Sequence, residues 1–125
     1  MNSNLSKVLI TAGLFLVIFI LGYVMNRSGK PYSVLLLTVH KLASLGILVY
    51  LIVTAVQLNK VSPLTGLELT AVIAAVVFFV AAIVTGGLVS VDKPMPDFVS
   101  WLHKIIPYLA LLSSAASFYL LLWRR

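Results

Sequence analysis

Residues 67–91 are LELTAVIAAVVFFVAAIVTGGLVSV, an apolar run whose single charged residue, Glu68, lies near its start. A helix needs about 20 predominantly apolar residues to cross the hydrocarbon core of a bilayer. The run is too long for one strand of a soluble sheet, and in lipid its backbone amides must be satisfied within the segment. This stretch therefore predicts a transmembrane α-helix.

Three further apolar runs of comparable length occupy residues 5–25, 32–58 and 98–123. The chain has 125 residues, of which 62% are hydrophobic, and its mean hydropathy is +1.14. A soluble core of this size could not bury so much apolar surface. No small-residue cleavage site follows the first run, so we interpret it as a retained helix and not as a signal peptide. We predict an all-α, membrane-embedded antiparallel four-helix bundle that forms one domain over residues 1–125.

The connections at residues 26–31, 59–66 and 92–97 are short, so sequence neighbours must run antiparallel. Both termini and the middle connection then share one membrane face. Nine Lys and Arg against three acidic residues give a net charge of +6. These charges lie mostly in loops and at the ends, which favours contact with anionic lipid and not with nucleic acid. We expect a multi-pass protein of a cell membrane, the bacterial inner membrane in particular, with cytoplasmic termini.

One pattern occurs twice: Lys-Pro, and then His-Lys with the histidine nine residues after the proline. The two copies are Lys30-Pro31 with His40-Lys41, and Lys93-Pro94 with His103-Lys104. Gly22, near the end of the first run, aligns with Gly86 when one gap is allowed. The pattern predicts a duplicated hairpin, residues 1–60 and 61–125. Since each copy has two spans, the copies are related by a pseudo-two-fold axis along the membrane normal.

His40 and His103 are the only histidines, and the repeat places both about seven residues inside their helices, or roughly 10 Å deep. The pseudo-two-fold axis can aim the two imidazoles at each other within one leaflet. A zinc site would need more protein ligands, but the chain has no cysteine and no acidic residue at that depth. Haem iron needs only two axial ligands from protein. We therefore predict that these two histidines ligate one haem b.

Other residues near the histidines suit the same cofactor. Lys41 and Lys104 could reach the haem propionates, as could three basic residues of the loops, Arg27, Lys30 and Lys93. Small residues, Gly22, Gly86 and Gly87, would let a flat macrocycle approach the backbone. Plainer roles stay open: a helix–helix hydrogen bond for the histidines, interfacial anchoring for the lysines and helix packing for the glycines.

At His40 and His103 the chain resembles the transmembrane b-type cytochromes, in which histidines on non-adjacent helices of a four-helix bundle clamp haem b. The resemblance covers the four-span layout, although its specific content is the two His-Lys pairs and the nearby glycines. It implies an electron carrier that exchanges electrons with a quinone or a redox protein. Only one haem follows, because a second histidine pair is lacking. The fragment TGGLVSVDKPMP (85–96) with HKIIP (103–107) is also similar to small bacterial membrane proteins of unassigned function.

Two other functions are compatible with the sequence. The chain could be a non-catalytic membrane subunit or assembly factor without a cofactor, in which the histidines only pack. It could also be a small proton-coupled exporter that works as a homo-oligomer. An exporter of this kind needs a membrane-embedded carboxylate, whereas Glu68, Asp92 and Asp97 all lie at predicted helix ends.

Overall fold

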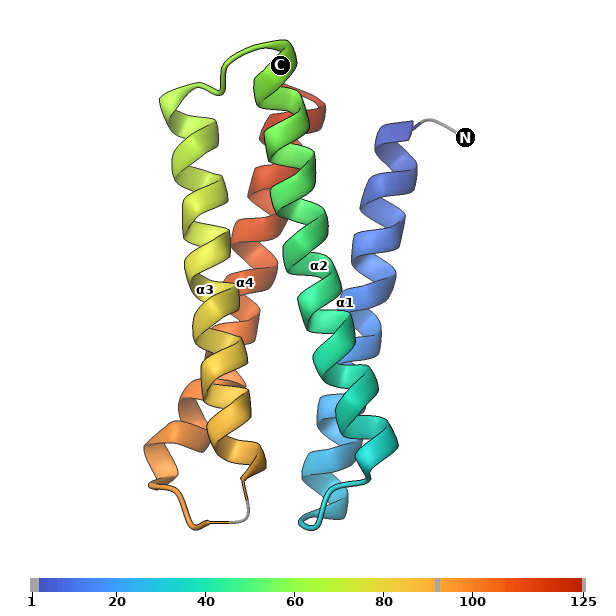
Figure 1. Ribbon diagram of the computed structural model, residues 1–125, viewed down its shortest axis with the longest axis vertical. Coiled ribbons are helices and arrows are strands. Elements are labelled where there is room, and N and C mark those ends of the chain that lie inside the picture. Colours follow the sequence, from blue (N-terminus) through green and yellow to red (C-terminus); the bar gives the residue numbers. More distant parts are fainter. Residues whose placement is uncertain (1–2, 92, 125) are drawn as a thin grey trace.

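The computed structural model describes residues 3–91 and 93–124. Over these ranges the chain forms four α-helices and no strand: α1 (Ser3–Ser28), α2 (Val34–Val61), α3 (Gly66–Ser90) and α4 (Asp97–Leu122). Each helix is long and apolar enough to cross a bilayer. Figure 1 shows an up-and-down bundle in which the α2–α3 connection lies at the end of the bundle that holds the termini. The predicted all-α, four-helix membrane fold is confirmed.

The first connection covers residues 29–33, whereas the apolar runs predicted residues 26–31. The difference arises because local signals, and not hydropathy, set the helix ends. Helix α1 continues to Ser28 and stops at Gly29, whose φ of 71° is left-handed and whose N–H donates to the Met25 carbonyl at 3.0 Å. A glycine in this conformation is the common way to end a helix. Helix α2 starts two residues later than expected, after Ser33, whose side chain accepts from the Leu36 N–H.

The other helix ends also carry recognisable signals. The C-cap of α2 is Ser62, which is extended, as the residue before a proline tends to be. Thr65 and Glu68 form a capping box at the start of α3, in which each side chain accepts from the other's backbone N–H at 3.2 and 2.8 Å. Helix α4 begins directly after Pro96. Glu68 therefore serves as a helix cap, and Asp92 lies outside the described residues.

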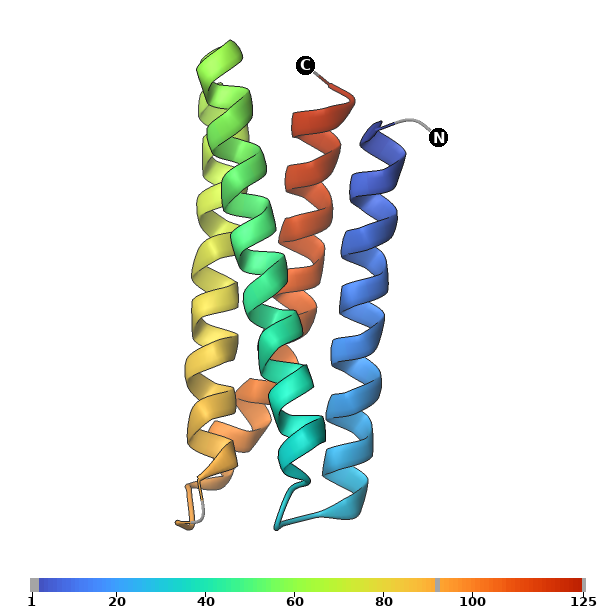
Figure 2. The same ribbon diagram turned by 45° about the vertical axis from the view of Figure 1, so that its right-hand side comes forward.

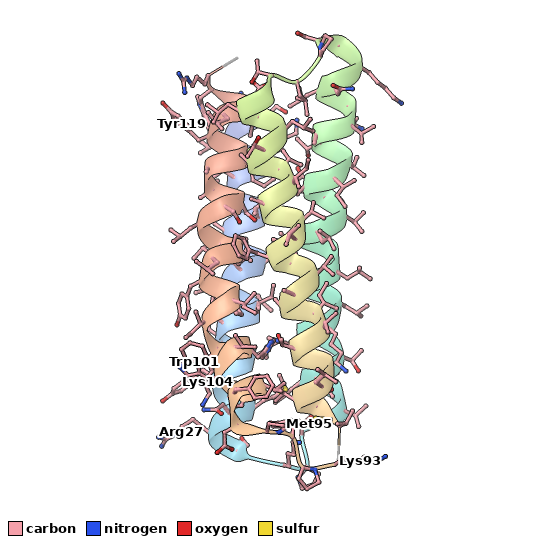
Figure 3. All side chains as sticks on the ribbon, turned by 90° about the vertical axis from the view of Figure 1, so that its left-hand side faces the viewer. Arg27, Lys93, Met95, Trp101, Lys104 and Tyr119 are labelled. Atoms are coloured by element: carbon pink, nitrogen blue, oxygen red, sulfur yellow. The ribbon has the colours of Figure 1, made fainter. Side chains whose placement is uncertain are left out.

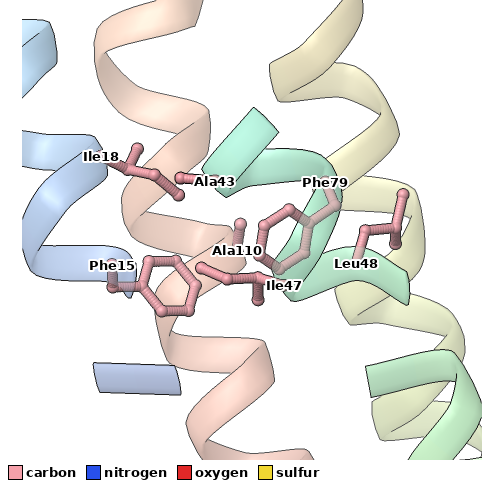
Figure 4. Close-up of a cluster of buried hydrophobic side chains, with 7 residues drawn as sticks. All are labelled: Phe15, Ile18, Ala43, Ile47, Leu48, Phe79 and Ala110. Carbon is pink, nitrogen blue, oxygen red and sulfur yellow. The ribbon is translucent and has the colours of Figure 1, made fainter. Parts of the chain in front are cut away.

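The two hairpins, α1–α2 and α3–α4, lie side by side in Figure 1, and the turned view of Figure 2 shows α2 in front of α3. Large apolar side chains such as Leu16 and Leu112 are more than 60% exposed, as expected for a surface that faces lipid tails. Figure 4 shows a buried cluster at the centre of the bundle to which all four helices contribute: Phe15, Ile18, Ala43, Ile47, Leu48, Phe79 and Ala110. Towards the termini, packing continues through Leu51, Ala75 and Phe118.

Candidate functional site

A cavity of about 580 Å³ lies in the half of the bundle that is closer to the first and third connections. Its walls come from all four helices: residues between 15 and 26, 32 and 45, 79 and 90, and 100 and 110. The volume falls within the range of about 300–1,000 Å³ that is usual for ligand pockets. The central cluster closes the cavity towards the middle of the bundle, since Phe15, Ile18, Phe79 and Ala110 belong to both. The cavity thus lies on one side of the packed centre, near one end of the bundle.

The two histidines line this cavity from non-adjacent helices, His40 from α2 and His103 from α4. Their ring centroids are 6.4 Å apart and the ring planes are inclined by 73°. Both side chains are half-buried. The only two imidazoles of the chain therefore lie next to each other inside the bundle.

Each imidazole has a hydrogen-bond partner at Nδ1. His40 Nδ1 lies 3.0 Å from the Ile18 carbonyl oxygen, which can only accept. His103 Nδ1 lies 3.1 Å from Thr85 Oγ1, and the Thr85 hydroxyl also lies 2.8 Å from the Ala81 carbonyl oxygen. The neutral His40 ring therefore carries its proton on Nδ1, whereas the direction of the His103–Thr85 hydrogen bond depends on the tautomer of His103. Nε2 of the neutral His40 ring then keeps its electron pair, the state that a metal ligand requires.

A glycine of the preceding helix lies against each histidine. A Cβ atom added to Gly22 would be 3.4 Å from His40 Cε1, an ordinary van der Waals contact. A Cβ atom added to Gly86 would be only 2.7 Å from His103 Cε1, closer than real Cβ atoms approach. Gly87 also lines the cavity, but nothing lies within 4 Å of its added Cβ. The close approach of His103 to α3 therefore requires glycine at position 86.

The basic residues near the cavity divide into two groups. Lys41 and Lys104 line it. Lys41 Nζ donates to Ser90 Oγ at 3.2 Å, and Lys30 Nζ donates to the Val91 carbonyl at 2.6 Å. These two lysines of the first hairpin thus reach the C-terminal end of α3, where helix carbonyls lack partners within the helix. They hold the hairpins together at this end of the cavity.

The other predicted basic residues do not line the cavity. Lys30, Lys93 and Arg27 are absent from its walls. Figure 3 shows Lys93 and Arg27 at the end of the bundle with the first and third connections, extending away from the helices. Lys104 lies in the same half of the bundle, on α4 and farther from the connections than Arg27 and Lys93. The structure therefore brings together the two histidines, the three glycines, Lys41 and Lys104.

Aromatic side chains form a part of the cavity that was not predicted from the sequence. The rings of Phe19 on α1 and Tyr108 on α4 stack with centroids 5.1 Å apart, and those of Phe15 and Phe79 lie 5.6 Å apart. Phe15, Phe19 and Gly22 follow one another at helical spacing, which could have indicated a common face. Phe79 and Tyr108 stand in uniformly apolar runs that offer no such signal.

Within residues 3–91 and 93–124 no group of three or more His, Cys, Asp or Glu side chains could hold a metal ion. His40 and His103 alone are therefore a poor site for a metal that takes all its ligands from protein, such as structural zinc.

Comparison with protein families, with curated sequences and with solved structures finds no significant match to this chain. The fold and the site define a multi-pass, four-helix membrane protein with a paired-histidine cavity near one membrane face.

Proposed function

We propose that this protein binds one haem b between α2 and α4, with His40 and His103 as the axial ligands, and that it carries electrons. The observation that supports this most is the separation of 6.4 Å between the two ring centroids. In a bis-histidine haem, each side adds about 2 Å from iron to Nε2 and about 1.1 Å from Nε2 to the ring centre, or about 6.2 Å in total. The imidazoles are thus spaced for one iron atom between them.

The hydrogen bonds of the two histidines support the same assignment. A histidine pair that only packed two helices together would be expected to share a direct hydrogen bond. Here each Nδ1 makes its hydrogen bond within its own hairpin, His40 with the Ile18 carbonyl and His103 with the Thr85 hydroxyl, so these contacts do not use Nε2. Metal-ligating histidines commonly use their second nitrogen in this way.

The remaining residues of the site have roles that follow from their positions. A bound haem would supply a one-electron redox couple. The aromatic and aliphatic walls would exclude water from the iron, and Gly22 and Gly86 allow the imidazoles to lie close to the backbone. Lys41 and Lys104, on the cavity wall near the connections, would neutralise the propionates.

Purification of the full chain in detergent, after expression with haem supplied, tests the proposal. A reduced-minus-oxidised spectrum and a pyridine haemochrome assay should give one haem b per chain. Purified protein that is folded and helical but contains no haem would leave the packing role of a cofactor-free subunit as the better account.

We expect Lys41→Ala and Lys104→Ala to weaken haem retention only modestly. Both side chains are exposed, and a surface charge pair contributes about 0–1 kcal/mol, or up to about fivefold in affinity. The measurement is the rate of haem transfer to an excess of apomyoglobin, with Lys7→Ala in the terminal half as the control. Rates identical to the control in both variants would identify these lysines as membrane anchors.

The position of the site predicts poor electron transfer across the whole membrane by one chain. The histidines lie roughly 10 Å inside a core of about 30 Å. The other half is filled by side chains such as Leu51, Ala75 and Phe118, and the chain has no further histidine. Electrons should therefore enter and leave at the face of the first and third connections, by way of a redox protein or a quinone in that leaflet.

Proteoliposomes with donor and acceptor sealed on opposite sides measure this directly. We expect slow transfer by the protein alone and faster transfer after a lipid-soluble quinone is added. Rapid transfer without quinone would show that the redox centre is not confined to one leaflet.

A further inference from the structure

The two hairpins meet along two seams, one between α2 and α3 and one between α1 and α4. At the cavity end of the bundle, two hydrogen bonds close the α2–α3 seam. Lys41 Nζ donates to Ser90 Oγ at 3.2 Å, and Lys30 Nζ donates to the Val91 carbonyl at 2.6 Å. Both lysines belong to the duplicated pattern, so the repeat predicts an equivalent pair of bonds across the other seam.

The α1–α4 seam is closed differently. In the second copy of the pattern, Lys93 and Lys104 hold the equivalent places. Among the residues that the structure describes, neither of these lysines makes a hydrogen bond or an ion pair with α1. Instead the rings of Phe19 and Tyr108 stack across this seam, with centroids 5.1 Å apart. An aromatic contact can separate without leaving a buried polar group unpaired, so this seam can open more easily.

Helix α4 also bends away from α1 beside the cavity. Near the termini the two helices are joined, since Asn4 Nδ2 donates to the Leu122 carbonyl at 2.8 Å. Pro107, inside α4, has no N–H for the carbonyl of His103, and a proline in such a position bends a helix. In Figure 2 the two helices lie close together near the termini and further apart at the other end. The seam is therefore held at the terminal end and is wider beside the cavity.

The cavity reaches the molecular surface along this seam. Tyr23 on α1 and Tyr108 on α4 both line it, although they are 65% and 58% exposed. Leu45 and Ile83 also line it and are exposed at the α2–α3 seam, but there the two lysine bonds join the hairpins. Lys104 lies one helical turn before Tyr108, so the two residues share a face of α4. The exposed ammonium of Lys104 is therefore next to the opening between α1 and α4.

We infer that the α1–α4 seam is the lateral entrance of the cavity, through which a planar, amphipathic anion passes from the adjoining lipid leaflet. That this anion is haem rests on the proposed function. The apolar macrocycle would pass between Phe19 and Tyr108, while its carboxylates stay near Lys104 at the level of the lipid headgroups. Lys41, which is bonded to Ser90, keeps the opposite seam closed. The two lysines, equivalent in the sequence repeat, thus have different roles.

Reversible cross-links test the entrance, because the natural chain has no cysteine. A short bis-methanethiosulfonate reagent bridges the α1–α4 seam in Phe19→Cys/Tyr108→Cys and the α2–α3 seam in Lys41→Cys/Ser90→Cys. Each haem-free protein is compared with itself after reduction of the bridge. We expect the first bridge to slow haem uptake about tenfold or more and the second to change it less than about twofold. Equal uptake with and without the first bridge would overturn the inference.

Cross-linking after haem has been loaded separates passage from binding. The α1–α4 bridge should then leave the haem spectrum unchanged and slow haem transfer to apomyoglobin. Loss of the spectrum would show that this seam is part of the ligand site and not its entrance.

The charge at the opening is tested by Lys104→Gln, which should slow haem uptake about three- to fivefold. Lys7→Gln, in the terminal half, is the control and should load at the wild-type rate. Equal rates for the two variants would overturn the role of Lys104.

Absence of haem from the wild type would overturn the proposed function, and the seams are then compared in the haem-free protein by double electron–electron resonance. Spin labels are placed at exposed positions, Tyr23→Cys/Trp101→Cys across α1–α4 and Leu42→Cys/Leu88→Cys across α2–α3. The α1–α4 pair should give the broader distance distribution, because the two lysine bonds fix α2 against α3. Equal widths for the two pairs would overturn the inference, whether or not haem is bound.

Discussion

Replacement of either His40 or His103 by alanine is expected to abolish the low-spin haem spectrum. Each substitution removes one of two axial ligands, and no other His, Cys, Asp or Glu of the described residues forms a metal-ligating group there. Because changes in residues that merely support a ligand already cost about 10–100-fold in metal affinity, loss of the ligand itself should exceed that range. Optical and electron paramagnetic resonance spectra of the purified variants provide the measurement.

Two controls separate ligation from folding in this experiment. Ser113→Ala lies on the same helix as His103, and its hydroxyl donates only to nearby backbone carbonyls of α4, so the spectrum should not change. Imidazole added to either alanine variant should enter the space that the side chain leaves and restore a low-spin signal. If either variant kept the full wild-type spectrum without imidazole, that histidine would not be a ligand.

The second large effect is expected from Gly86→Ala. The added Cβ would lie 2.7 Å from His103 Cε1 and 3.2 Å from Nε2, so the ring must move away from its position opposite His40. Overpacking of this kind costs about 1–3 kcal/mol, which corresponds to roughly 5–150-fold weaker haem binding. Haem titration of the purified apoprotein measures the change.

Gly22→Ala and Gly13→Ala are the matched controls for this variant. Both replace a helical glycine by the better helix former, so any general effect on helix stability is shared. The Cβ of Gly22→Ala would meet His40 at an ordinary 3.4 Å, and that of Gly13→Ala would meet nothing within 4 Å. Haem affinity should therefore change only a few-fold in the first and not at all in the second. Equal affinities for Gly86→Ala and Gly22→Ala would show that His103 need not hold its present position.

The sequence allows the fold to be predicted because lipid restricts the choices so strongly. Runs as long and apolar as residues 67–91 have few alternatives to a spanning helix, and short connections dictate antiparallel neighbours. The helix ends were predicted less well, to within about three residues, since they depend on local contacts. Helix α1 continues until the left-handed Gly29, and α2 begins only after its N-cap residue Ser33. A hydropathy pattern contains no information about either signal.

The site was only partly predictable. The duplicated Lys-Pro and His-Lys pattern predicted that the two histidines, Gly22 and Gly86 belong to one site. Helices that are apolar on all sides do not reveal which face turns inwards. The hydrogen bond between Thr85 and His103 therefore became apparent only from the structure. The direction of Lys30, towards the end of α3 and not into the cavity, likewise depends on how the hairpins meet.

The central claim, that one iron lies between His40 and His103, is tested most directly by near-infrared magnetic circular dichroism of the oxidised wild-type protein. The position of the charge-transfer band in this spectrum depends on the two axial ligands of low-spin haem. We predict a band characteristic of two imidazoles, from one haem per chain. A His–Met band would contradict the account and would direct attention to Met25, which also lines the cavity. A high-spin spectrum, or no haem at all, would contradict it equally.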